Sequence, residues 1–177
     1  AANLTTGTAN IVIGFGALDA ADGGEGFNVA IGNTAMGAVD EGSNNSDDNV
    51  AIGSDALLGG TGQVQHNVVI GASAMNSTGS NAQTGTVAIG SSALTALTSG
   101  ASNTAIGYQS MTTLTTGDNN TALGYNALYT DDTGNESTAI GRLCMYNQAS
   151  DADEDTGNTG VGSSAGYYNV TGTNNTY

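Results

Sequence analysis

The amino-acid sequence predicts an all-β fold, a parallel β-solenoid of the β-roll type, and three observations lead to this prediction. A nine-residue motif with the consensus Asn-Thr/Val-Ala-Ile-Gly-x-x-Ala-Leu/Met recurs nine times in the 177 residues, and successive copies begin 17 to 21 residues apart. The fourth residue of the motif is aliphatic in every copy. The fifth residue is glycine in every copy. A short, regular period is typical of solenoids, in which each repeat forms one coil stacked on its neighbours.

The repeats cover the whole chain, so residues 1–177 are interpreted as one solenoid domain. The nine copies begin at residues 10, 28, 49, 67, 86, 103, 120, 137 and 158, and a tenth begins at Asn175. Counted from Asn as position 1, residue 1 falls at position 9 and residue 177 at position 3. The chain therefore begins and ends within a coil, and about ten coils of 17–21 residues are expected.

Each coil is expected to contain two short strands and two turns. Position 2 is β-branched in every copy and position 4 is aliphatic, which is a strand pattern with a period of two residues. Glycine at position 5 then ends the strand, because it permits backbone angles that other residues avoid. A second short segment, seen at residues 114–117 and 97–100, ends at another glycine. No 3.6-residue period is present, so no helix is expected.

The aliphatic residue at position 4 is predicted to point inward and to form the structural core. Alanine at position 8 and leucine or methionine at position 9 supply the next inward side chains after the glycine bend. The predicted core residues at position 4 are Ile13, Ile31, Ile52, Ile70, Ile89, Ile106, Leu123, Ile140 and Val161. Asparagine at position 1 recurs in most copies, and stacked asparagine side chains can hydrogen-bond to one another along such a rod.

The charge balance excludes several classes of partner. The net charge is −15, and Arg142 is the only lysine or arginine in the sequence. Nucleic-acid binding is not expected, because phosphates are neutralised by lysine and arginine.

Membrane insertion is not expected either, since no apolar run approaches the length of a membrane span. With one histidine, one cysteine and no nucleophile or phosphate-loop motif, the chain is not expected to be an enzyme or to need a cofactor, calcium excepted.

Acidic residues gather in the segments between motifs, and two interpretations stay open for them. Asp151, Asp153 and Asp155 alternate along the chain like the carboxylates of a calcium loop, although the glycine and glutamate of an EF-hand loop are not at their usual places. The alternative is a solvated acidic surface that keeps a flat rod soluble and discourages pairing between sheets.

Three further features concern the surface and the interior. Tyr108, Tyr125 and Arg142 share position 6 in successive coils, so they are expected to stack, either as structural packing or as a row that holds sugar rings. Cys144 replaces the inward alanine of position 8 and is expected to be a buried, inert thiol. Seven Asn-x-Ser/Thr sequences lie outside the inward positions and are glycosylation candidates: Asn3, Asn44, Asn76, Asn119, Asn135, Asn169 and Asn174.

The motif resembles the head repeats of trimeric autotransporter adhesins, whose coils carry an Asn-Ser-Val-Ala-Ile-Gly core. It is also similar to repeats in some bacteriophage tail fibres, with the clearest copies at Asn103–Met111 and Asn120–Leu128. The adhesin resemblance implies a parallel β-roll, assembly as a trimer, and binding to surfaces or extracellular matrix. The period of 17–21 residues is longer than that of the adhesin repeat, and a stalk, coiled-coil heptads or a membrane anchor are not recognised within these 177 residues.

These observations lead to a functional hypothesis. The chain is expected to be an extracellular structural or adhesive fibre segment, at a cell surface or on a virion, that stacks head-to-tail or as a multi-chain rod. Its expected partners are further copies of itself and surface glycans. The alternatives are a bacteriophage tail-fibre shaft or receptor-binding segment, and a calcium- or ice-binding solenoid.

Overall fold

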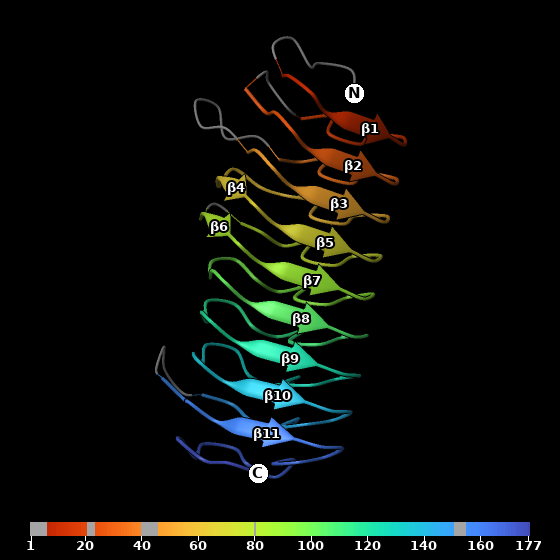
Figure 1. Cartoon of the computed structure of the whole chain (residues 1–177). Helices are drawn as coiled ribbons and strands as arrows, with labels where there is room; N and C mark the ends of the chain where they lie inside the picture. The colour runs from red at the N-terminus through yellow and green to blue at the C-terminus, as the bar shows by residue number, and fades with distance from the viewer. Residues whose placement is uncertain (1–6, 21–23, 40–45, 80, 151–154) are drawn as a thin grey trace.

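The computed structural model confirms a parallel β-solenoid in the residues that it describes, which are 7–20, 24–39, 46–79, 81–150 and 155–177. One wall of the rod is a parallel sheet of nine strands in chain order (Figure 1). Its strands are β1 (Ile11–Ile13), β2 (Val29–Ile31), β3 (Val50–Ile52), β5 (Val68–Ile70), β7 (Val87–Ile89), β8 (Thr104–Ile106), β9 (Thr121–Leu123), β10 (Thr138–Ile140) and β11 (Thr159–Val161). Nine strands enclose eight complete turns, and the described residues contain no helix.

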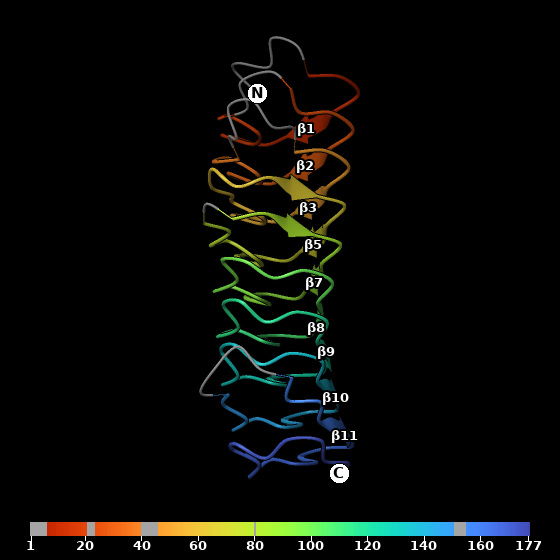
Figure 2. The ribbon, with the colours of Figure 1, turned by 90° about the vertical axis from the view of Figure 1, so that its left-hand side faces the viewer.

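The register of this sheet follows the sequence repeat without a shift. Val50 pairs with Val29 and with Val68, and the same position-to-position pairing holds from β1 to β11. Equivalent side chains therefore form columns that run along the rod. Figure 2 shows the sheet on one side of the molecule, with the remaining walls formed by turns and extended segments.

The prediction of two strands in every coil is wrong for most of the described coils. A second, two-stranded sheet contains only β4 (Val64–Gln65) and β6 (Gln83–Thr84), and an isolated bridge joins Asn135 to Asp155. The coils differ in length, and the extra residues fall between position 10 and the next asparagine. The wall that contains β4 and β6 therefore cannot keep the common register on which a continuous ladder of strands depends.

Glycine at position 5 is required by close packing between coils as well as by backbone geometry. Gly107 has φ of 137°, and a Cβ atom on it would lie 2.6 Å from the carbonyl carbon of Gly124 in the next coil. The corresponding glycines from Gly14 to Gly162 all have φ between 132° and 142°. The corner then continues through residues with positive φ at positions 7 and 9, such as Gln109 and Met111.

The predicted direction of the strand side chains is wrong. Position 3 points inward and positions 2 and 4 point outward, as Ala105 is fully buried while Thr104 and Ile106 are half-buried. The residues predicted as core are half-buried or exposed on the outside of the sheet: Ile13, Ile31, Ile52, Ile70, Ile89, Ile106, Leu123, Ile140 and Val161.

The width of the coil explains this orientation. Leucine or methionine at position 9 is fully buried in eight coils, from Leu18 to Met145, and fills the interior from the wall opposite the sheet. The side chain at position 3 occupies the space that remains beneath the strand. It is alanine in most coils and valine in two of them, Val12 and Val69. The expectation that positions 8 and 9 point inward is confirmed for the described coils up to Met145.

Candidate interaction surface

The outward residues at positions 2 and 4 form a broad apolar face on the nine-stranded sheet, which we call the outer sheet face. Its position 2 column is isoleucine or valine from Ile11 to Val87 and threonine from Thr104 to Thr159. Its position 4 column is aliphatic throughout, and no copy of the motif carries an acidic residue at either position. A strongly acidic chain thus has one face without acidic groups in its two central columns.

Position 6 forms one edge of the outer sheet face, and its stacked residues lie as expected. The rings of Tyr108 and Tyr125 are stacked with centroids 5.6 Å apart, and the guanidinium carbon of Arg142 lies 5.9 Å from the Tyr125 centroid. The predicted stacking is therefore confirmed. Because Tyr125 is stacked between Tyr108 and Arg142, its ring faces are engaged within the protein, and Tyr108 has the more accessible face for a sugar ring.

A second tyrosine column was missed by the sequence interpretation. Tyr129, Tyr146 and Tyr167 at position 10 stack with centroids 5.0 Å and 5.4 Å apart, and Tyr168 packs edge-on against Tyr167. Desolvation raises the pKa of the Tyr146 phenol, and the neighbouring tyrosines raise it further. The sequence signal for this column is tyrosine at the same position of three successive repeats. Position 10 lies just after the nine-residue motif, so a comparison of the motif copies alone does not include it.

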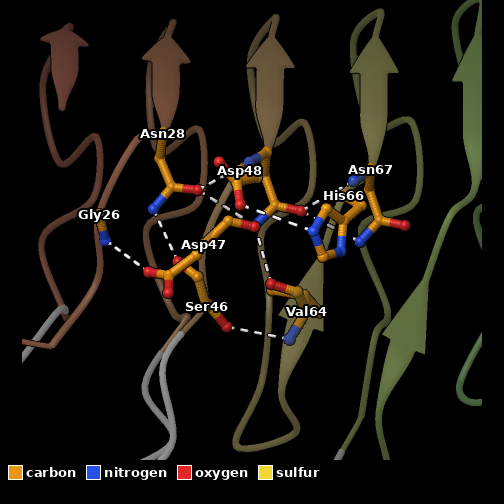
Figure 3. A network of polar contacts seen from close by, with 9 residues as sticks. Gly26, Asn28, Ser46, Asp47, Asp48, Val64, His66 and Asn67 are labelled. Carbon is orange, nitrogen blue, oxygen red and sulfur yellow. Dashed lines mark hydrogen bonds and ion pairs between the residues drawn. The ribbon is translucent and has the colours of Figure 1, made fainter. Parts of the chain in front are cut away.

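The asparagines at position 1 point inward and connect the walls of the solenoid. The side-chain amide of Asn28 donates a hydrogen bond to the carbonyl oxygen of Ser46 at 2.7 Å, and its oxygen accepts one from the backbone N–H of Asn49 at 2.9 Å. Figure 3 shows this arrangement for Asn28, with Ser46 on the segment that leads into β3. Each such asparagine thus links neighbouring coils and closes its own coil.

The predicted hydrogen bonds between stacked asparagine side chains are present in part of the column. The amide of Asn49 donates to the side-chain oxygen of Asn28 at 3.1 Å, and Asn67 donates to Asn49 at the same distance. In the coils that begin at Asn103 and Asn120, the amides bond the carbonyl oxygens of Gly117 and Gly134 instead. The column is therefore mainly a set of side-chain-to-backbone clamps.

Several acidic residues have structural roles rather than forming a uniform solvated surface. A side-chain oxygen of Asp47 accepts a hydrogen bond from Gly26 N–H at 2.6 Å, which fixes a corner between coils (Figure 3). Asp118 accepts one from Ala101 N–H at the same distance. On the outside, His66 Nε2 lies 3.6 Å from Asp48 Oδ2, and both side chains are exposed.

A buried polar network replaces leucine at position 12 near the C-terminal end. Leu97 and Leu114 are followed in this inward column by Asp131 and Gln148, both essentially fully buried. Asp131 accepts hydrogen bonds from Gln148 Nε2 and from Ser150 Oγ, each at 2.7 Å. Since the carboxylate has several donors and lies inside the rod, it is a structural element of the interior.

The remaining candidate sites receive little structural support as binding sites. Asp151 and Asp153 of the calcium hypothesis lie outside the described residues, and Asp155 is exposed. The described part of the chain contains no group of three or more histidine, cysteine or acidic residues that could hold a metal ion, and no pocket was found there. Nor do the described residues include a helix able to span a membrane.

The glycosylation candidates and the cysteine can be placed in the fold. Asn3 and Asn44 lie outside the described residues, Asn119 and Asn174 are exposed, and Asn76, Asn135 and Asn169 are half-buried. Asn135 and Asn169 already accept backbone hydrogen bonds, from Asp118 and Gly172. Cys144 is fully buried, as expected, and burial raises the pKa of its thiol.

Comparison of the chain with protein-family models, with curated proteins and with solved structures gives no match. The resemblance to adhesin and tail-fibre repeats thus extends, in the structure, to the β-solenoid fold alone. The function has to be argued from the columns and faces described above.

Proposed function

We propose that this chain is a segment of an extracellular structural or adhesive fibre. The observation that supports the proposal best is the unbroken nine-stranded ladder, in which every strand pairs in register with the next. Such a ladder gives a rod with identical backbone spacing along its length. Its stability comes from contacts between neighbouring coils, so coils can be added without changing the existing ones.

The interior of the rod supports a mechanical role. Amide clamps of asparagine close seven of the coils, with the acceptor carbonyl three residues before the next repeat in each of them. The side-chain oxygens of the same asparagines accept hydrogen bonds from the backbone N–H groups of the next coil, as Asn28 does from Asn49 and Asn103 from Asn120. These bonds resist shear between coils, because breaking them would leave buried backbone groups unpaired. Solubility of an exposed rod is favoured by the net charge of −15.

The partners in this proposal are further copies of the chain and surface glycans. Tyr108 is the most suitable group for a sugar ring, since it ends its stack and is 48% exposed. A bacteriophage tail-fibre shaft uses the same rod and is the alternative biological setting. The extracellular or virion location rests on the motif resemblance.

An ice-binding role has weaker support from the outer sheet face. Threonine occupies position 2 only from Thr104 to Thr159, and its neighbour at position 4 is aliphatic rather than threonine. The face therefore carries one short threonine column beside an apolar one, and not the regular pairs of threonines expected for ice recognition.

Negative-stain electron microscopy of the purified chain tests the fibre proposal. The expected result is straight rods of constant width that lengthen with protein concentration or join into filaments. Light scattering on the same samples should show mass rising with length. Particles that stay at the length of one chain at every concentration would contradict the fibre proposal.

A further inference from the structure

The exposed large apolar side chains are concentrated on one face of the rod. Of the eleven such residues in the described part of the chain, eight lie on the outer sheet face or at its two edges, positions 0 and 6, where position 0 is the residue before each motif. They are Ile11, Ile13, Phe15, Phe27, Tyr108, Leu123, Tyr125 and Val161. None of them lies in the three coils of β3, β5 and β7, where half-buried valine and isoleucine at positions 2 and 4 join the two exposed groups. Exposed apolar side chains that gather on one face, rather than scattering singly, mark an interaction site.

The shape and size of this face suit a flat protein partner. The strands keep nearly the same direction from β1 to β11 (Figure 1), so the face is close to flat. Flat sheets of many strands are unusual and are stabilised by side-chain ladders, such as the asparagine column on the inner side here, or by stacking on another surface. Nine strands at about 4.8 Å and six residues at about 3.3 Å define a face of about 800 Å², which is the area that one partner contributes to a standard interface.

The charges at the two edges indicate what the partner is. Arg142 stands at position 6 of its coil and Glu136 at position 0 of the same coil, so they lie at opposite edges of one rung. Both are exposed, and within the described residues Arg142 has no carboxylate within ion-pair distance. A second copy placed parallel and in register brings the position 6 edge of one chain beside the position 0 edge of the other.

We infer that the outer sheet face is the docking site for another copy of this chain, parallel and in register, with Arg142 of each copy beside Glu136 of its neighbour. This inference rests on the fibre proposal and names the lateral contact within such a fibre. Parallel packing matches the aliphatic coils of one copy with those of the other. Centred antiparallel packing would instead place Arg142 against the coil of Phe27 and Asn33, which has no carboxylate at either edge.

The test measures chain mass by light scattering coupled to size-exclusion chromatography, over a range of concentrations. The intact chain is expected at the mass of two or three copies. Arg142→Glu and Glu136→Arg are each expected to raise the dissociation constant about tenfold or more, and the double variant is expected to restore it to within about threefold. Asp132→Arg is the matched control for Glu136→Arg, because it also replaces an exposed acidic residue by arginine but lies on another wall of the rod. It should leave association unchanged.

Ile89→Asp provides a second, independent variant on the face. It places a carboxylate in the apolar column and should yield a monomer that keeps the circular dichroism spectrum of the parent. A parent chain that is monomeric at all concentrations would overturn the inference, as would a double charge swap that fails to restore association. Rods that lengthen while remaining one chain wide would overturn the lateral contact and leave the fibre proposal standing, so the two failures are distinguishable.

Discussion

Ala105 and Ile106 are neighbours on the same three-residue strand, yet they meet opposite environments. Ala105 is fully buried under the sheet, and the larger and more hydrophobic Ile106 lies half-exposed outside it. The inside of the coil is already filled by Met111 from the other wall, so the strand can contribute only a small residue there. In a narrow solenoid, available volume decides which residue points inward, and hydrophobicity alone does not.

The largest expected effect comes from the glycine corner, where coils approach most closely. Gly107→Ala would place a Cβ atom against the Gly124 backbone and force an unfavourable φ, so a loss of at least about 3 kcal/mol in unfolding free energy is expected. Urea denaturation measures this loss.

Gly85→Ala is the matched control for the corner. Gly85 also has positive φ, but a Cβ atom there would come no closer than 3.9 Å to its neighbours, and Ala9 and Ser102 occupy the same repeat position with similar φ. A cost of about 1 kcal/mol is expected. Equal losses in the two variants would show that contact between coils is not what requires glycine at position 5.

The next effect concerns the asparagine clamps on the inner side. Asn120→Thr removes the amide that bonds Gly134 O at 2.7 Å and the oxygen that accepts Ser137 N–H at 2.9 Å. Because both backbone groups are then buried without these partners, a loss of about 2 kcal/mol is expected in urea denaturation.

Thr86 provides the reciprocal test, since threonine replaces asparagine in the column there. Thr86→Asn is expected to leave stability unchanged or to raise it. If Asn120→Thr proved neutral, the clamps would not contribute to holding the coils together.

A smaller effect is expected where an inward residue departs from the consensus. Cys144 replaces alanine at position 8, and the next coil has Gly160 in place of alanine at position 3; a Cβ atom there would lie 2.7 Å from the Cys144 sulfur. Gly160→Ala should therefore cost about 1–2 kcal/mol by overpacking, and adding Cys144→Ala should recover most of it. Additive losses in this double-mutant cycle, read from thermal unfolding, would exclude the size compensation.

The smallest expected effect is a pH dependence of stability that comes from Tyr146, in the tyrosine column at position 10. Desolvation and, to a lesser extent, the neighbouring Tyr129 and Tyr167 raise the pKa of Tyr146 above its usual value. Its contribution to stability is therefore fully present below about pH 10 and is lost as the pH rises through the raised pKa. The melting temperature of the parent should fall more steeply than that of Tyr146→Phe between about pH 9 and about pH 11, and parallel curves would contradict this.

The sequence predicts the features that depend on the repeat itself. The spacing of the motif predicts a parallel solenoid, the glycine at position 5 predicts a corner, and equal positions predict stacked columns such as Tyr108 and Tyr125. All of these follow from one coil lying on the next in register. Burial of Cys144 follows in the same way, because it shares a position with inward alanines.

The sequence does not settle features that depend on the cross-section of the coil. Alternation along a strand divides its residues into two sets but does not say which set points into the coil. A shift of one residue in this assignment moves every side chain to the opposite face of the sheet. Asn103 and Ala105 belong to one set and Thr104 and Ile106 to the other, and hydrophobicity alone favours the second set as the inner one. The inward asparagine could have indicated the true direction, since its amide reaches the Gly117 carbonyl only from inside the coil.

The direction of the strand side chains is tested most directly by one pair of variants, Ala105→Asp and Ile106→Asp, compared by thermal unfolding followed by circular dichroism. Ala105→Asp buries a carboxylate beneath the sheet and is expected to cost several kcal/mol, enough to lose the cooperative transition. Ile106→Asp places the same group on the outer sheet face and is expected to keep the β spectrum and most of the melting temperature. A folded Ala105→Asp variant together with an unfolded Ile106→Asp variant would contradict this account of the fold.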